Sequence, residues 1–111
     1  MSWRRAAFNQ LWDDHAEWSQ ATFGSDSVKG PEGALNHLKK EVEEAIAAPR
    51  DKEEYADLFL LVIDAARRSG MTCRQFTNAC RRKLEKCKGR TWIEGKDGVF
   101  EHDRTTENLQ A

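Results

Sequence analysis

The sequence predicts an all-α domain built from four helices. Apolar residues recur at helical spacing in four segments, over residues 5–22, 32–48, 51–69 and 72–90. Glycine and proline separate these segments: a loop is expected over residues 23–33, Pro49 ends the second helix, and Gly70 closes the third. Asp51 and Thr72 each stand three residues before Glu or Gln, the capping-box pattern that opens a helix.

The first predicted helix has an aromatic face. Phe8, Leu11 and Trp12 are expected in the core, since they fall at helical spacing with His15 and Trp18. Trp18, near the end of the helix, has two open interpretations: it packs in the core, or it lines the mouth of a pocket, where a planar nucleobase could stack on it. The glycine-containing loop that follows is a candidate lid over a substrate.

Composition narrows the possible functions. At 111 residues the chain is expected to form one core, helped by a partner subunit. Its net charge of −1 gives no reason to expect nucleic-acid or membrane binding, and the absence of a membrane-length apolar run predicts a cytoplasmic protein. Cys73, Cys80 and Cys87 are seven residues apart on one helical stripe, so they are expected to be core residues rather than disulfides.

The chain becomes polar after Trp92, with glycines and scattered charge. We therefore expect a helical domain over residues 1–92 and a polar C-terminal arm over residues 93–111.

Two pairs of carboxylates stand out around the break between the second and third helices. Glu41 and Glu44 share one helical face, and Glu54 and Asp57 share a face of the next helix. If these helices are antiparallel neighbours, the four carboxylates converge, and a divalent cation with a preference for oxygen ligands, Mg²⁺ or Mn²⁺, suits such a site. A structural alternative exists for Glu54, which fits the capping box of Asp51.

Charge is divided between the two halves of the chain. Residues 41–57 carry a net charge of −5 and residues 73–90 a net charge of +6. Lys83, Lys86 and Arg90 form one basic helical face, which either contacts phosphate oxygens or is a solvated surface. His37 lies one turn before Glu41, beside the carboxylates, and is either structural or part of the site. Asp64 and Arg68, four residues apart, are expected to form an ion pair.

The pattern Glu-x-x-Glu, nine residues, Glu-x-x-Asp resembles the signature of the MazG-like, all-α nucleoside triphosphate pyrophosphohydrolases. Further segments resemble the dATP/dGTP diphosphohydrolase subgroup, which is found largely in phages and prophages. The resemblance extends from about Trp12 to Arg104, with matches at Trp18-Ser19, Thr22-Phe23-Gly24, Gly30-Pro31, His37-Leu38, Ala47-Ala48-Pro49, Ala56-Asp57, the run from Asp64 to Gly70, Lys83-Leu84, Arg90-Thr91-Trp92 and His102-Asp103-Arg104.

The resemblance implies a four-helix-type bundle that forms a homodimer or homotetramer and hydrolyses dGTP or dATP to the monophosphate and pyrophosphate. It implies Mg²⁺, replaceable by Mn²⁺, held by Glu41, Glu44, Glu54 and Asp57. Glu41 or Glu44 would serve as the catalytic base, Lys83, Lys86 and Arg90 would bind phosphate, and Trp18, His37 and Trp92 would bind the base. Cys87 stands where many relatives have Asn.

Two other classes of function are also compatible with the sequence. One is a non-catalytic helical module that binds metal and nucleotide for regulation. The other is a helical adaptor that binds nucleic acid or protein through the basic face, which would leave the four carboxylates without a purpose.

Overall fold

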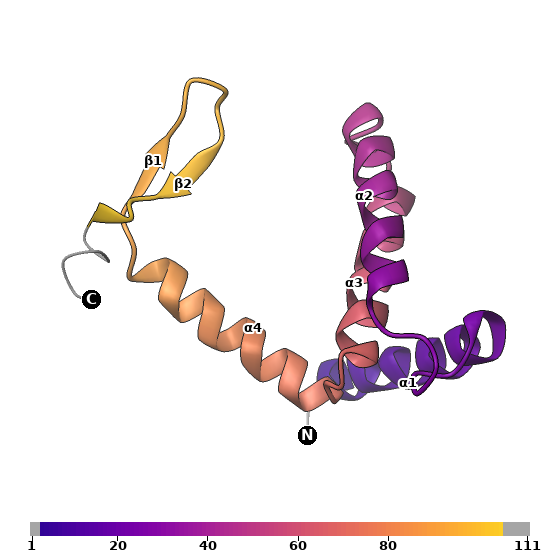
Figure 1. Cartoon of the computed structure of the whole chain (residues 1–111). Helices are drawn as coiled ribbons and strands as arrows, with labels where there is room; N and C mark the ends of the chain where they lie inside the picture. Colours follow the sequence, from indigo (N-terminus) through magenta and orange to yellow (C-terminus); the bar gives the residue numbers. More distant parts are fainter. Residues whose placement is uncertain (1–2, 106–111) are drawn as a thin grey trace. The chain divides into compact units, whose positions relative to one another are not determined.

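A computed structural model describes residues 3–105 of the chain. Within these residues the all-α prediction is confirmed, with one small strand pair added (Figure 1). The elements are α1 (Trp3–Phe23), α2 (Glu32–Ala47), α3 (Lys52–Arg68), α4 (Cys73–Lys88), β1 (Trp92–Glu94) and β2 (Phe100–His102). None of the helices in this described part has the length and apolar character needed to cross a membrane.

The chain divides into two compact units, Met1–Phe76 and Thr77–Ala111. The first contains α1, α2, α3 and the first turn of α4; the second contains the rest of α4 and the strands. The strands form an antiparallel hairpin in which Trp92 pairs with His102 and Glu94 with Phe100. Part of the predicted polar arm is thus an ordered hairpin, and residues 106–111 of that arm lie outside the described residues.

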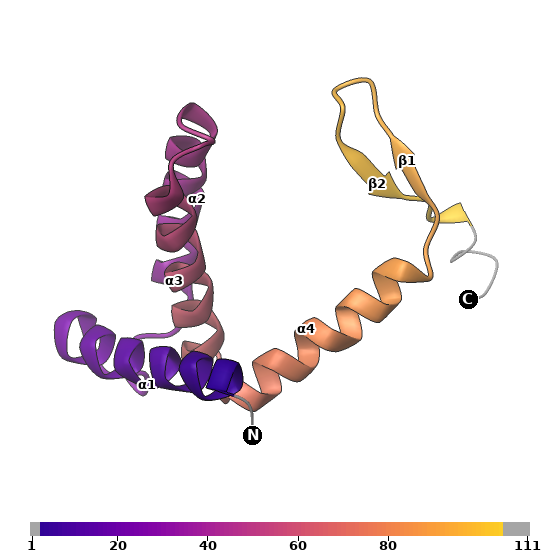
Figure 2. The ribbon, with the colours of Figure 1, turned by 180° about the vertical axis from the view of Figure 1, so that it is seen from behind.

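Within the first unit, α2 and α3 lie side by side, as both views in Figures 1 and 2 show, and form its most extensive helix contact. The short turn between them reverses the chain, because Pro49 cannot continue α2 and Asp51 begins α3. The helix α1 packs against α3 as well. The antiparallel arrangement that the carboxylate hypothesis needs is therefore present.

The core of this unit is small and aromatic. Trp12 is buried, with its ring centroid 6.2 Å from Phe8 and 5.7 Å from Phe76. Phe8 in turn lies 5.9 Å from Phe59 of α3, and Ile63 is fully buried. These contacts join α1, α3 and the start of α4.

Helical spacing also predicts inward positions for Leu35, Leu38, Val42, Ala45 and Ile46 of the second helix and for Leu84 of the last, but several of these residues are exposed. In α2, Ala45 is buried and Leu38 half-buried, but Leu35, Val42 and Ile46 are exposed, and so is Leu11 of α1. The prediction was wrong for these residues because α3 covers only one flank of the apolar stripe on α2. In the second unit, Leu84 and Cys80 are also exposed, so neither is a core residue of the chain.

The local signals at the helix ends are confirmed in most respects. Thr72 and Gln75 form the full capping box, because each side chain accepts a hydrogen bond from the other's backbone N–H, at 3.1 and 2.9 Å. Gly70 has φ +107° after α3, a backbone conformation that favours glycine. Asp51 caps α3, but its side chain accepts from the N–H of Glu53 at 3.0 Å.

Candidate active site

Three carboxylates from α2 and α3 form a compact cluster. One oxygen each of Glu41, Glu44 and Glu54 lies within 4.8 Å of the others. The two α2 residues are one turn apart, and the antiparallel packing of α3 brings the third beside them. Asp57, one turn further along α3, is exposed and is not part of this group of three.

Mutual repulsion changes the proton affinity of the cluster. The pKa of Glu44 is raised by a hydrogen bond with Glu41, by the negative charge of Glu41, and then by partial burial and the charges of Glu54 and Asp57. The pKa of Glu54 is raised by burial first, and then by the charges of Asp51, Asp57 and Glu41. Asp57 therefore acts on the cluster through its charge even though it lies outside the group of three.

The cluster has the chemistry of a cation site. Oε2 of Glu41 and Oε2 of Glu54 are buried and have no hydrogen-bond partner among the described residues. A buried anionic oxygen without a partner is unfavourable, and hard divalent cations prefer carboxylate oxygens as ligands. The side chains present thus fit a divalent ion. The backbone N–H of Asp51, which a capping box would pair with Glu54, donates to the carbonyl of Ala48 at 3.0 Å instead.

His37 connects the cluster with a neighbouring pocket. Its Nε2 lies 3.0 Å from Oε1 of Glu41, one turn along α2. His37 also lines a pocket of about 480 Å³ between the α1–α2 loop, the first turns of α2, and α3. Phe23, Val28, Lys29, Gly30, Glu32, Gly33, Ala34, Leu61, Asp64 and Arg68 complete the lining. A cavity of this size is typical of small-molecule sites.

Of the other predicted base-binding residues, Trp18 lies near this pocket. It is exposed and packs edge-on against the pocket residue Phe23, with ring centroids 5.3 Å apart. Trp92 belongs to the second unit, where its Nε1 donates to the carbonyl of Cys87 at 2.9 Å and its ring lies 5.9 Å from His102. Its partners in that unit are thus the end of α4 and the hairpin.

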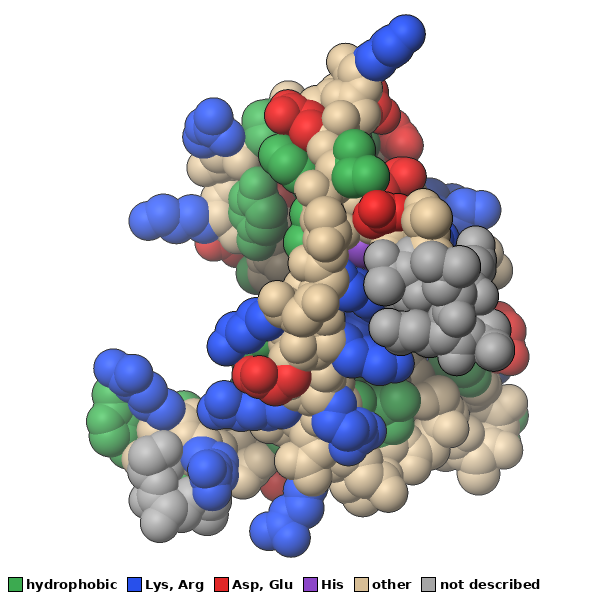
Figure 3. All heavy atoms as spheres, turned by 90° about the vertical axis from the view of Figure 1, so that its left-hand side faces the viewer, with side chains coloured by type: hydrophobic (Ala, Val, Ile, Leu, Met, Phe, Trp, Pro, Cys, Tyr) green, Lys and Arg blue, Asp and Glu red, His purple; other side chains and the backbone are tan. Residues whose placement is uncertain are grey.

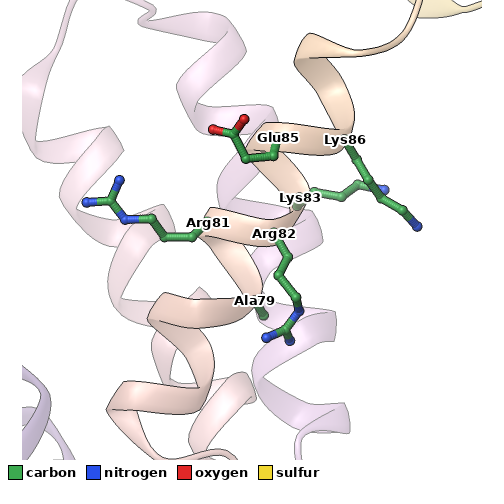
Figure 4. Close-up of a pocket in the computed structure, with 6 residues that line it drawn as sticks. All are labelled: Ala79, Arg81, Arg82, Lys83, Glu85 and Lys86. Carbon is green, nitrogen blue, oxygen red and sulfur yellow. The ribbon is translucent and has the colours of Figure 1, made fainter.

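The predicted phosphate-binding residues lie on and just after α4, in the second unit. Lys83 and Lys86 are exposed beside Arg81 and Arg82, while Arg90 is half-buried beyond the helix end. Figure 4 shows Arg82, Lys83 and Lys86 directed to one side of the helix, and Arg81 with Glu85 to the other. The space-filling view of Figure 3 shows many Lys and Arg side chains on the face that it presents.

The ion pair predicted between Asp64 and Arg68 is present and belongs to a larger buried network. Arg68 Nε donates to Asp64 Oδ1 at 3.1 Å, and Arg67 Nη2 donates to the same oxygen. Ser19 of α1 donates to it too, at 2.8 Å. Burial opposes the charged form of Asp64, but the hydrogen bonds from Ser19, Arg67 and Arg68 outweigh burial and lower its pKa.

Sequence reasoning missed the rest of this network and most of the pocket. Ser19 and Asp26 are 41 to 49 residues from their partners on α3, so no local spacing connects them. Arg67, by contrast, stands three residues after Asp64, a helical spacing that could have predicted this pair. A further usable signal was present: Arg67 and Arg68 lie about one helical turn after the apolar run of residues 58–63, and buried arginines need partners.

Comparison with known proteins agrees with the fold, which is that of the MazG-like all-α proteins. The solved MazG-like pyrophosphohydrolase of cyanophage S-2L, bound to dGDP and three catalytic Mn²⁺ ions per active site, is 29% identical to this chain with a TM-score of 0.71. That similarity covers 86% of this chain and 96% of the cyanophage chain.

The sequence model of one family within this class matches residues 11–108. The chain belongs to the dATP/dGTP pyrophosphohydrolase family. It is also 49% identical, over 85 residues, to the Eaa protein of Salmonella phage P22. Those residues are 77% of this chain and 26% of the phage protein, so the chain spans about a quarter of that relative's length.

Proposed function

We propose that this protein hydrolyses purine deoxynucleoside triphosphates, dGTP or dATP, to the monophosphate and pyrophosphate in a reaction that depends on a divalent cation. The observation that carries the proposal is the cluster of Glu41, Glu44 and Glu54, with two buried carboxylate oxygens that lack partners. Family membership and the dGDP-bound, Mn²⁺-containing structural relative support the same chemistry.

In this proposal, Glu41, Glu44, Glu54 and Asp57 would hold Mg²⁺, for which Mn²⁺ can substitute. The bound ion would supply neutralisation of phosphate charge and a lowered pKa of a water molecule. Glu41 or Glu44 would accept the proton of the attacking water. His37 fixes the orientation of Glu41 through the contact at 3.0 Å.

The pocket beside His37 is the proposed site for the base and sugar. Phe23 and His37 line it, and Trp18 supports Phe23 edge-on, so a planar purine would meet aromatic rings on the α1 side. Trp92 is the third proposed base contact. Because His37 lines the pocket and also contacts Glu41, we expect the phosphates of a nucleotide in the pocket to extend toward the carboxylates.

Lys83, Lys86 and Arg90 are proposed to bind the polyphosphate. Their positive charges would stabilise the negative charge that builds up on the departing pyrophosphate. We further propose a homodimer or homotetramer, because Leu35, Val42 and Ile46 expose an apolar strip on α2 in the single chain.

Product analysis tests the proposed reaction. Each common dNTP and NTP is incubated with Mg²⁺ and then with Mn²⁺, and the products are separated by chromatography. We expect dGTP or dATP to give the monophosphate and pyrophosphate directly. Diphosphate with orthophosphate would contradict cleavage between the α and β phosphates. Saturable nucleotide binding without turnover would instead support a regulatory module.

Without metal, repulsion among the clustered carboxylates is expected to make the melting temperature depend on pH. A carboxyl group whose pKa is raised by folding contributes stability that is fully present below its unfolded pKa and is lost as the pH rises through its folded pKa. Glu44 and Glu54 are two such groups. Without metal, their contribution to the melting temperature should therefore increase from pH 7 toward pH 5.

Added Mn²⁺ should reverse that trend, because it compensates the charges and competes with protons for the same oxygens. Thermal melts with EDTA or Mn²⁺ should show a larger stabilisation by Mn²⁺ at pH 7 than at pH 5. The exposed neighbour Glu43 supplies the control variant, Glu43→Gln, which should respond as the wild type does. Equal melting temperatures with EDTA and Mn²⁺ at pH 7 would contradict a metal site here.

A further inference from the structure

The α1–α2 loop, residues 24–31, is held in place by two buried arginines of α3. Arg67 and Arg68 are both buried, and the loop residues Asp26 and Lys29 are among their partners. Buried guanidinium groups are stable only when their donors are satisfied. The placement of this loop is therefore tied to two side chains of a different element.

Arg68 holds the loop at its first residue and again near its end. Its Nη1 donates to the carbonyl of Gly24 at 2.9 Å and to the carbonyl of Lys29 at 3.1 Å. Its Nη2 donates to Ser19 Oγ at 2.9 Å, and its Nε donates to Asp64 at 3.1 Å. One planar group thus connects α1, the loop and α3.

Arg67 holds the middle of the loop. Its Nε donates to Asp26 Oδ2 at 3.0 Å, and its Nη1 lies 3.3 Å from Nδ1 of His15. Inside the loop, the N–H groups of Val28 and Lys29 donate to the carbonyl of Ser25 at 3.0 and 2.9 Å. The loop is therefore a compact turn fixed from outside at three points.

The same loop forms one wall of the pocket beside the carboxylates. Val28, Lys29 and Gly30 line it from the loop, and Arg68 itself reaches the lining. His37 of α2, which contacts Glu41, also lines this pocket. A displacement of the loop would change the shape of the pocket while leaving the carboxylate cluster intact, since no residue of the loop belongs to that cluster.

We infer that Arg68, supported by Arg67, is a positioning residue that fixes the α1–α2 loop as the wall of the nucleoside pocket, and so determines substrate affinity rather than the rate of the chemical step. The inference rests on the proposed function for its substrate. Lysine cannot replace arginine here, because an ammonium group lacks the planar fork that reaches two carbonyls, a hydroxyl and a carboxylate together.

The test compares Arg68→Lys with the wild type and with Arg74→Lys, a matched change at an exposed position of α4. Arg68→Lys should raise KM for the preferred dNTP by about tenfold or more, because hydrogen bonds to a charged group are lost, while kcat stays within about twofold. Hydrogen exchange at the amides of Val28 and Lys29 should accelerate in this variant. Arg74→Lys should leave KM, kcat and exchange unchanged.

A separate variant tests whether the pocket binds the nucleoside. Gly33 lines the pocket, and a Cβ added there would meet no atom within 4 Å, so Gly33→Leu places a side chain on the lining at a residue outside the arginine hydrogen bonds described above. It should raise KM and weaken binding of dGDP with Mn²⁺, while exchange at Val28 and Lys29 stays as in the wild type. Titration of dGDP gives a readout even if no dNTP is hydrolysed.

The outcomes separate the two proposals. If the wild type hydrolyses no dNTP but Arg68→Lys weakens dGDP binding and loosens the loop, the proposed reaction fails and the positioning role stands. If Arg68→Lys leaves the loop amides protected, or lowers kcat alone with KM unchanged, the positioning role is overturned.

Discussion

Asp57→Asn and Glu44→Gln should each abolish most of the hydrolysis, by at least about a hundredfold in kcat, while the protein stays folded. Both changes remove one negative charge from the proposed cation site and keep the size of the side chain. The loss should be greatest in kcat, because the missing charge weakens metal-dependent stabilisation that is strongest in the transition state. Initial rates of pyrophosphate release at saturating dNTP measure the effect.

These two changes should not lower the stability of the fold. This result would distinguish a metal site from a cluster of carboxylates with a structural role. Glu44 is subject to repulsion from Glu41, Glu54 and Asp57, so neutralising it relieves unfavourable charge contacts in the absence of metal. The melting temperature of Glu44→Gln in EDTA should therefore equal or exceed that of the wild type. If the carboxylates were structural, the variants would melt earlier and remain active.

Glu43→Gln is the control for both variants. Glu43 is exposed on α2, lies next to Glu44 in the sequence, and is not part of the group of three carboxylates. Its replacement changes the net charge of the chain by the same amount and should preserve activity. Full activity in Asp57→Asn and Glu44→Gln would refute the assignment of the metal site.

Asp64→Asn is expected to cause the largest loss of stability, about 3–5 kcal/mol, because it leaves two buried arginines without their shared carboxylate. Asp64 is buried and accepts hydrogen bonds from Ser19, Arg67 and Arg68. An amide has no charge, and only its oxygen can accept. Such a loss is a large part of the stability of a typical small domain. Urea denaturation followed by circular dichroism measures it.

Asp26→Asn is the comparison for this variant. Asp26 pairs with Arg67 at 3.0 Å but is only half-buried, so its loss should be nearer to about 1 kcal/mol. If Asp64→Asn does not accumulate as folded protein, Ser19→Ala replaces it in the test. That change removes one hydrogen bond to the Asp64 carboxylate and should cause a smaller loss of stability. Equal stability of Asp64→Asn and the wild type would contradict the structural importance of the network.

The contribution of Asp64 should also show a defined pH dependence. Folding lowers its pKa, so its stabilisation is present above its unfolded pKa and is lost as the pH falls through the lower, folded value. This is opposite in sign to Glu44 and Glu54. The stability deficit of Asp64→Asn relative to the wild type should therefore be full at pH 7 and shrink only in strong acid.

Much of the fold could be predicted from local sequence. The capping box of Thr72 and Gln75, the glycine at position 70 and the break at Pro49 all act through the backbone of adjacent residues, so they were readable without tertiary structure. The same applies to the spacing of Glu41 and Glu44 on one helical face and to the ion pair between Asp64 and Arg68.

Only the tertiary structure decided which distant residues meet. It placed Glu54 beside Glu41 and Glu44, and it left Asp57 outside that group. It also left the apolar strip of Leu35, Val42 and Ile46 on α2 exposed among the described residues. It also joined Arg68 to the loop carbonyls of residues 24 and 29. Sequence spacing determines which side chains share a helical face, whereas contacts between elements depend on how the faces pack, which no local pattern specifies.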